Sequence, residues 1–155
     1  MKVSIDRFNG AFEQKDGTDA FIDNVVALEA LFSKQEDPFM GTTVRLSKRL
    51  ALFLESDPHR RKDLFCEMIR LYDSRGKIIH GGYTESIDIV KTRDYLIRSY
   101  LKYFDFLGAD NFSHTSFINE LDLEAKKFSM KRKDCQVKHV HKNEYNYTSP
   151  DFLFG

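Results

Sequence analysis

The stretch "DPHRRKDLFCEMIRLYDSRGKIIHGG", residues 57–82, carries a strong helix signal. Asp57 followed by Pro58 is typical of a helix start, because aspartate caps the first turn and proline suits the first helical position. Behind them, apolar residues recur at spacings of three and four: Leu64, Phe65, Met68, Ile69 and Tyr72. Gly81 and Gly82 predict the end of this helix.

The same reasoning predicts four more helices, over about 19–35, between 38 and 58, from 84 to 108 and over about 114–129. Thr18 or Asp19 can cap the first of these, and Thr84 can cap the third. No run of alternating strand residues precedes residue 135. We therefore expect an all-α fold, a compact helical bundle of about five helices. Residues 1–130 form this domain, and residues 131–155 form a basic, then aromatic, partly irregular C-terminal tail.

Two of these helices carry specific expectations about which face is buried. In the helix over 84–108, a stripe of residues at helical spacing is expected to face the core: Ile87, Val90, Ile97, Leu101 and Phe104, extended by Leu96, Tyr100 and Tyr103. Between the prolines, one apolar side is expected to be buried: Val44, Leu46, Leu50, Phe53 and Leu54. Arg45, Lys48 and Arg49 are expected to face elsewhere.

Composition suits one soluble domain. The 155 residues are 41% hydrophobic, include 14 Phe and 7 Tyr, and carry no net charge. The charge is unevenly spread, since residues 126–142 hold seven Lys or Arg against one acid, a net +6, and the remainder must carry −6. Such a segment either helps to bind a polyanion or is simply a soluble tail.

The two cysteines do not indicate a disulfide framework, and Cys66 among apolar neighbours is interpreted as a small core residue. The N-terminus lacks the apolar region of a secretory signal. No segment reaches the roughly 18 apolar residues that a membrane span needs. We therefore expect a reduced, cytoplasmic location with no membrane partner.

Arg75 and His80 are the candidate catalytic pair. Arginine offers a fixed fork of donors to phosphate oxygens, and histidine exchanges protons near neutral pH. Together they supply what RNA cleavage without a metal requires. Five steps along an ideal helix turn about 140°, so one helix does not point both side chains the same way. A chance pair, with His80 acting only as a helix cap, stays open.

Four segments resemble the Apea-like branch of the HEPN superfamily in their order: "RF" at 7–8, "FIDNVVALEALF" at 21–32, "RLSKRLALFL" at 45–54 and "LYDSRGKIIHGG" at 71–82. The superfamily's Arg-x4-6-His motif falls on Arg75 and His80. The resemblance implies a compact helical bundle that dimerises with two motifs face to face. Active members are metal-independent endoribonucleases, often toxins or effectors of antiviral defence, and some members are inactive scaffolds.

Two positions depart from the superfamily pattern. Gly76 stands where a polar residue commonly follows the motif arginine. Related toxins carry a tyrosine, modified by a partner, two residues after the histidine, whereas Tyr83 is three residues after His80. Three functions therefore stay open: an active homodimeric ribonuclease, an inactive dimerisation module, and a toxin controlled by an antitoxin or other partner through Tyr83.

Glu29, Asp73 and Arg49 are candidates for supporting roles, and Arg45, Lys48 and Arg49 either form a phosphate-binding face or belong to an ordinary exposed helix surface. Glu29 can orient an arginine such as Arg45, Arg49 or Arg75, or lie at the edge of the apolar face. Asp73 can position Arg75. Among the basic residues, Arg45, Lys48 and Lys77 are candidates for RNA binding. Cys135, His139 and His141 have the alternation of a ligand group but lack the spacing of structural zinc sites, so we expect neither metal nor cofactor.

Overall fold

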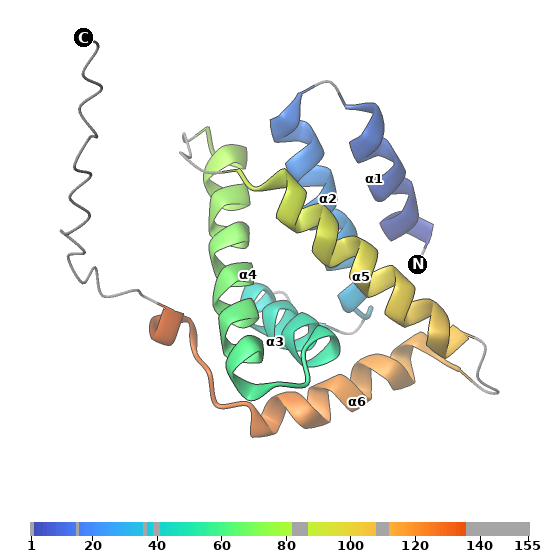
Figure 1. The fold of residues 1–155 in the computed structure, drawn as a ribbon, viewed down its shortest axis with the longest axis vertical. Coiled ribbons are helices and arrows are strands. Elements are labelled where there is room, and N and C mark those ends of the chain that lie inside the picture. Colours follow the sequence, from blue (N-terminus) through green and yellow to red (C-terminus); the bar gives the residue numbers. More distant parts are fainter. Residues whose placement is uncertain are drawn as a thin grey trace, which may run out of the picture.

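The computed structural model describes residues 2–14, 16–35, 37–38, 41–81, 87–107 and 112–135. Over this part of the chain the fold is all-helical and contains no strand, which confirms the predicted helical bundle (Figure 1). The elements are α1 (Lys2–Glu13), α2 (Gly17–Phe32), α3 (Thr42–Leu54), α4 (Pro58–Ile79), α5 (Ile89–Leu107), α6 (His114–Lys127) and the short 3₁₀ helix η1 (Arg132–Cys135). None of the described helices is long and apolar enough to cross a membrane.

Helix α1 is an addition to the five predicted helices. It lies beside α2 and α5 (Figure 1), and its buried residues are small, Ser4 and Ala11. The Ser4 hydroxyl donates to the carbonyl of Ala27 at 2.7 Å. Its oxygen therefore accepts a hydrogen bond from the Tyr100 hydroxyl, at 2.8 Å. Ile5 and Phe8 of α1 also pack, partly buried, against the core, and the Phe8 ring lies edge-on to the Tyr100 ring with centroids 5.3 Å apart.

The ends of α4 are as predicted. The Asp57 carboxylate accepts hydrogen bonds from the backbone of His59 and Arg60, and Pro58 is the first helical residue. The helix ends at Ile79, and Gly81 follows with φ of +77°, the left-handed conformation that glycine tolerates. It runs unbroken through Gly76, where a Cβ atom would meet nothing within 4 Å.

Two other helix starts differ from expectation. Asp16, rather than Thr18 or Asp19, caps α2, and its carboxylate accepts from the backbone of Thr18 at 2.6 Å. For α5, Asp88 accepts from the backbone of Lys91 at 2.9 Å. Thr84, predicted as this cap, lies outside the described residues.

The core forms around α2, whose Phe21, Val25, Leu28, Leu31 and Phe32 are at most 1% exposed. Against them pack residues from the other helices: Leu46 and Leu50 of α3, Phe65 and Met68 of α4, Leu96 of α5 and Ile118 of α6. Burying each large apolar side chain contributes roughly 1.5–3 kcal/mol before entropy is counted.

The predicted apolar stripe of α5 is only partly buried. Leu96, Tyr100 and Tyr103 lie in the core as expected, and Ile87 packs against it. The other four residues are exposed: Val90 (81%), Ile97 (40%), Leu101 (64%) and Phe104 (50%). The buried face also carries Thr92, Tyr95 and Ser99, which the prediction did not include. Periodicity could not select the face, because the tyrosines are held by partners on other helices, Tyr100 by Ser4 and Tyr103 by His114.

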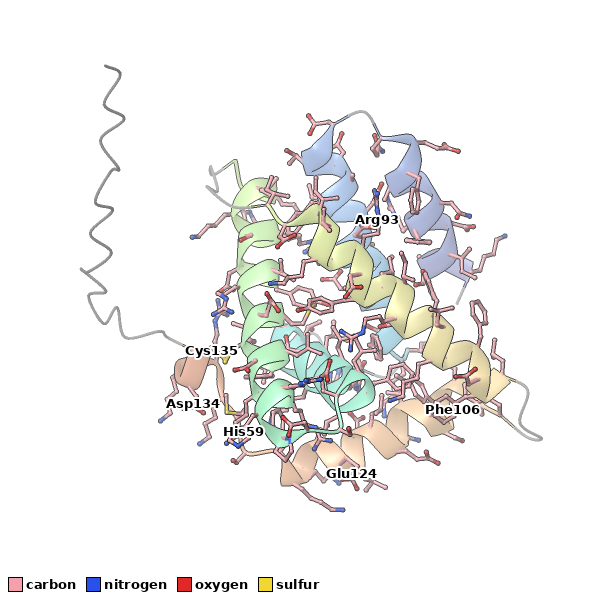
Figure 2. All side chains as sticks on the ribbon, in the orientation of Figure 1. His59, Arg93, Phe106, Glu124, Asp134 and Cys135 are labelled. Carbon is pink, nitrogen blue, oxygen red and sulfur yellow. A yellow bond between two sulfur atoms is a disulfide. The ribbon has the colours of Figure 1, made fainter. Side chains whose placement is uncertain are left out.

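The two cysteines are joined, contrary to the expectation of unpaired thiols. Cys66 and Cys135 form a disulfide across 69 residues of sequence. After α6 the chain returns along α4, and η1 brings Cys135 to within 4.9 Å of Cys66, measured between Cα atoms (Figure 2). The first residues of the predicted tail are therefore fastened to the domain, and the cysteines no longer support a reduced environment. Residues 136–155 lie outside the described part.

Candidate functional site

A cleft of about 990 Å³ opens beside the last turns of α4. Its walls come from three helices and from η1, which the disulfide holds against α4. It is lined by Glu29 and Ser33 at the end of α2, by Gly41, Thr42, Thr43 and Val44 at the start of α3, by Tyr72, Asp73, Arg75, Gly76 and Lys77 of α4, and by Arg132. Arg75 thus lies in the cleft together with two further cations, Lys77 and Arg132.

Glu29 is the acid nearest to Arg75. The Arg75 Nη2 atom lies 3.6 Å from Glu29 Oε2, and the two side chains are 31% and 24% exposed. Burial raises the pKa of Glu29, and the positive charge of Arg75 acts in the opposite direction. Burial, with the nearby Glu29 charge, also raises the pKa of Tyr72. Glu29 therefore holds Arg75 near the cleft, one of the alternatives that its sequence position allowed.

The guanidinium of Arg75 is only loosely held. Its contact with Glu29 is an ion pair beyond hydrogen-bond distance, and its Nε is buried without a hydrogen-bond partner among the described residues. Arg49, by comparison, makes five hydrogen bonds. The donors of Arg75 therefore remain able to bind an anion in the cleft.

His80 lies at the exposed end of α4 and does not line the cleft. Its backbone N–H donates to the Gly76 carbonyl at 3.2 Å, and the N–H of Gly81 donates to the Ile78 carbonyl at 3.0 Å, while the His80 ring has no hydrogen bond to a described residue. The ring of His114 differs, because Nδ1 pairs with the Tyr103 hydroxyl at 3.0 Å and Nε2 with the Ser33 carbonyl at 2.9 Å. His114 is thus a structural histidine, whereas His80 is exposed and its ring lacks such partners among the described residues.

One chain does not bring Arg75 and His80 to a common point. Arg75 faces the cleft, whereas His80 extends from the helix end. Because α4 stays helical through Gly76, the expected rotation of about 140° between the two residues is retained.

Asp73 and Arg132 form a second pair at the cleft. Arg132 Nη2 donates to Asp73 Oδ1, so Asp73 is engaged with η1, and no contact with Arg75 was found for it. Lys77 is exposed at the rim. Arg132 was expected only as part of the basic segment, and its place in the cleft was not predicted. The sequence signal for this position is that Arg132 lies three residues before Cys135. That signal is useful only if the disulfide of Cys135 with Cys66 on α4 is already known.

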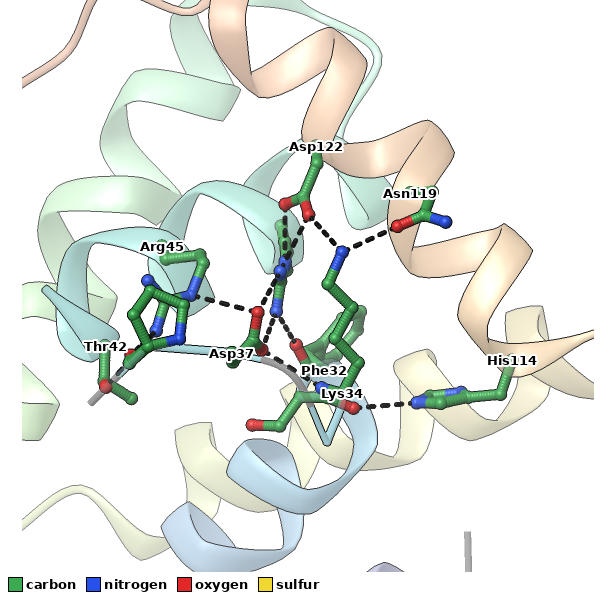
Figure 3. Close-up of polar contacts among 11 residues, drawn as sticks. Phe32, Lys34, Asp37, Thr42, Arg45, His114, Asn119 and Asp122 are labelled. Carbon is green, nitrogen blue, oxygen red and sulfur yellow. Dashed lines mark hydrogen bonds and ion pairs between the residues drawn. The ribbon is translucent and has the colours of Figure 1, made fainter. Parts of the chain in front are cut away.

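Arg49 is fully buried, so the expectation that it faces away from the core is wrong. It donates to both carboxylate oxygens of Asp37, to both of Asp122 and to the carbonyl of Phe32 (Figure 3). Burial alone would lower the pKa of Arg49, but the hydrogen bonds to Asp37 and Asp122 outweigh it and raise the pKa. Arg49 thereby joins α3 to the end of α2, to the loop that follows α2 and to the middle of α6. It is a structural residue and is absent from the cleft lining.

Arg45 and Lys48 also make contacts within the domain. Arg45 donates to the Pro38 carbonyl at 2.5 Å and lies 3.4 Å from Asp37, measured from Nε to Oδ1. Lys48 donates to the Phe128 carbonyl, lies over that ring, and has its pKa lowered by burial. These two residues and Arg49 do not form one exposed phosphate-binding face on α3.

Several candidates lie outside the described residues, namely Tyr83, His139 and His141. Among the described residues, no group of three or more His, Cys, Asp or Glu side chains is placed to hold a metal. No protein-family model matches the chain, and no curated protein or solved structure matches it either.

Proposed function

We propose that this chain is a metal-independent endoribonuclease of the HEPN type, which acts as a homodimer with Arg75 and His80 in a shared cleft. The observation that carries the proposal is that neither side chain makes a hydrogen bond to a described residue. Arg75 lines a cleft with two other cations and is paired only with Glu29, at 3.6 Å, and the His80 residue is exposed. The resemblance of residues 71–82 to the superfamily motif supports the same assignment.

The chemistry divides between the two residues. His80 of one protomer removes the proton of an RNA 2′-hydroxyl, whose oxygen attacks the adjacent phosphorus. The bond from phosphorus to the 5′ oxygen breaks, and His80 of the second protomer donates a proton to that leaving oxygen. Arg75 from each protomer stabilises the negative charge on the phosphoryl oxygens. The products are a 2′,3′-cyclic phosphate and a 5′-hydroxyl, and no water or electron is consumed.

A second copy of the chain can bring together the Arg75 and His80 side chains that one chain keeps apart. Arg75 and His80 diverge along α4, so a twofold axis near the ends of two α4 helices is needed to bring the four groups to one phosphate. Glu29 acts as a positioning residue, since it contacts Arg75 from α2 and keeps the guanidinium at the cleft wall. A cytoplasmic toxin or antiviral effector, controlled by an antitoxin or other partner, is the biological role that we assign.

The decisive test is RNA cleavage in EDTA, comparing wild type with Arg75→Ala and His80→Ala. His59→Ala is the matched control, because His59 is exposed at the opposite end of the same helix (Figure 2). We expect activity to fall at least a hundredfold in the first two variants and to be unchanged in the control. Cleavage that survives in both variants would eliminate the site.

Diluting wild type with His80→Ala tests the shared cleft. If one dimer needs His80 from both protomers, a mixed dimer is inactive, and after subunit exchange the activity falls with the square of the wild-type fraction. An activity that falls only in proportion to the wild-type fraction would mean that the two protomers do not share the site.

A second candidate is a HEPN-type dimerisation module without catalysis. The exposed apolar face of α5 favours it, because a contiguous apolar patch marks an interaction site. Self-association of a wild-type chain that cleaves neither tRNA, mRNA nor rRNA would support this candidate.

A further inference from the structure

Four exposed apolar residues of α5 form one narrow stripe. Val90, Ile97, Leu101 and Phe104 are separated by seven, four and three residues, so their side chains lie within about 60° of one another around the helix. On α1, Phe12 is 54% exposed, and its ring centroid lies 4.2 Å from the guanidinium carbon of Arg93 of α5. A monomer gains nothing from leaving these side chains in water.

Val90 and Phe104 lie symmetrically about Ile97, whereas the position symmetric to Leu101 is Arg93. Val90 precedes Ile97 by seven residues, and Phe104 follows it by seven, which is close to two helical turns in each direction. When two copies of α5 run antiparallel about a twofold axis at Ile97, Val90 of each copy meets Phe104 of the other. A small side chain then faces a large one at both ends, and the seam keeps an even width. A parallel pair would set Phe104 against Phe104 and Val90 against Val90.

Charges beside the stripe are complementary in the antiparallel arrangement. Asp94 and Arg98 lie on the same flank and form an ion pair within the chain at 3.7 Å, with side chains 58% and 39% exposed. In an antiparallel pair the same flank of each helix meets, so Asp94 comes within roughly 3 Å along the axis of Arg98 of the second copy. The same offset brings Asp105 to Lys91 of the second copy, and both encounters join opposite charges.

We propose that this stripe, defined by Val90, Ile97, Leu101 and Phe104, is the interface at which a second copy of the chain docks antiparallel. The occupant is another copy because a twofold rotation at Ile97 sets Val90 against Phe104 and brings the flanking acids to bases of the second copy, as an isologous contact requires. This surface is different from the α4 ends that the proposed function brings together. A chain with both interfaces forms a closed tetramer or a longer array, and a chain with the α5 interface alone forms a dimer.

The molar mass in solution tests the interface. Ile97→Glu places a charge at the twofold axis of an apolar seam and should halve the mass measured by light scattering. The matched control is Leu123→Glu on α6, because Leu123 is 58% exposed, similar to Leu101, but lies outside the stripe. A wild-type chain that is monomeric at every concentration, or an unchanged mass in Ile97→Glu, overturns the proposal. RNA cleavage is measured separately, so loss of the proposed function and loss of this interface are distinguishable.

Cross-linking tests the direction of the pair. The two natural cysteines are bonded to each other, so an introduced cysteine is the only free thiol. Ile97→Cys should form a disulfide with its own copy under mild oxidation. Val90→Cys and Phe104→Cys should cross-link only when mixed. Rapid self-cross-linking of Val90→Cys would indicate a parallel pair and overturn the antiparallel arrangement.

Discussion

Replacing Arg49 with methionine should destabilise the domain by about 3 kcal/mol. The side chain is 0% exposed and donates five hydrogen bonds, four of them to Asp37 and Asp122. Removing one partner of a buried ion pair costs roughly 3–5 kcal/mol, because the other charge stays behind. We expect the lower end, since Asp37 is 11% and Asp122 28% exposed, and Lys34 remains 3.3 Å from Asp122.

Urea unfolding followed by circular dichroism measures this loss. The control is Lys127→Met, which removes an exposed ion pair with Glu124 and should cost less than about 1 kcal/mol. An Arg49→Met variant that loses less than about 1 kcal/mol would refute the reasoning, because the network would then be no stronger than a surface pair.

The network of Arg49 with Asp37 and Asp122 makes the difference in unfolding free energy between wild type and Arg49→Met depend on pH. Burial alone would raise the pKa of Asp37 and Asp122, but hydrogen bonds from Arg49 outweigh it and lower both below their ordinary value of 3.8. Their stabilising contribution is therefore complete above pH 3.8 and is lost as the pH falls through the lowered folded-state pKa. The gap in unfolding free energy between wild type and Arg49→Met should narrow below about pH 4. A gap that stays constant on acidification would contradict this account.

Three other predictions concern the cleft and the segment that returns to it. Gly76→Ala should raise the unfolding free energy by about 0.5–1 kcal/mol in urea titrations, because the position is helical and a Cβ atom has open space; a destabilised variant would contradict the open space. Cys66→Ser with Cys135→Ser should lower it by about 2–4 kcal/mol in the same titrations, since the bond closes a long loop; an unchanged free energy would mean that the bond does not form. Arg132→Ala should reduce the salt dependence of RNA binding, the slope of log K against log salt, by about 1 in fluorescence anisotropy. Lys133→Ala, exposed beside it but absent from the cleft lining, should leave the slope unchanged, and equal effects would remove Arg132 from the site.

The parts of the fold that local chemistry determines could be predicted. The Asp57-Pro58 start and the Gly81 end of α4 depend on backbone groups only a few residues away, and both are where the sequence indicates. The helical class follows in the same way from the spacing of apolar residues.

Which face a helix buries depends on partners that are distant in sequence. Arg49 has the spacing of a surface residue. Its charge is stable in the core because it is paired with Asp37 and with Asp122, which lies 73 residues later. In α5, the exposed stripe is more apolar than the buried face, because the tyrosines there find hydroxyl partners on α1 and α6. The pairing of Cys66 with Cys135 is equally long-range.

In the candidate site, the motif residues could be found but their surroundings could not. Arg75 and His80 were selected for their chemistry, and Glu29 for its place among apolar neighbours. Arg132 lies in the cleft only because the chain runs back to α4 after α6. No local sequence pattern predicts this return.

The Cys66–Cys135 bond closes part of the chain into a covalent ring. The ring, residues 66–135, contains Arg75, His80, the exposed stripe of α5 and Arg132, whereas α1, α2 and α3 lie outside it. A single peptide-bond break anywhere between the two cysteines leaves one molecule, and its pieces part only on reduction. The motif and the proposed docking surface are therefore tethered to each other twice, once in each direction around the ring.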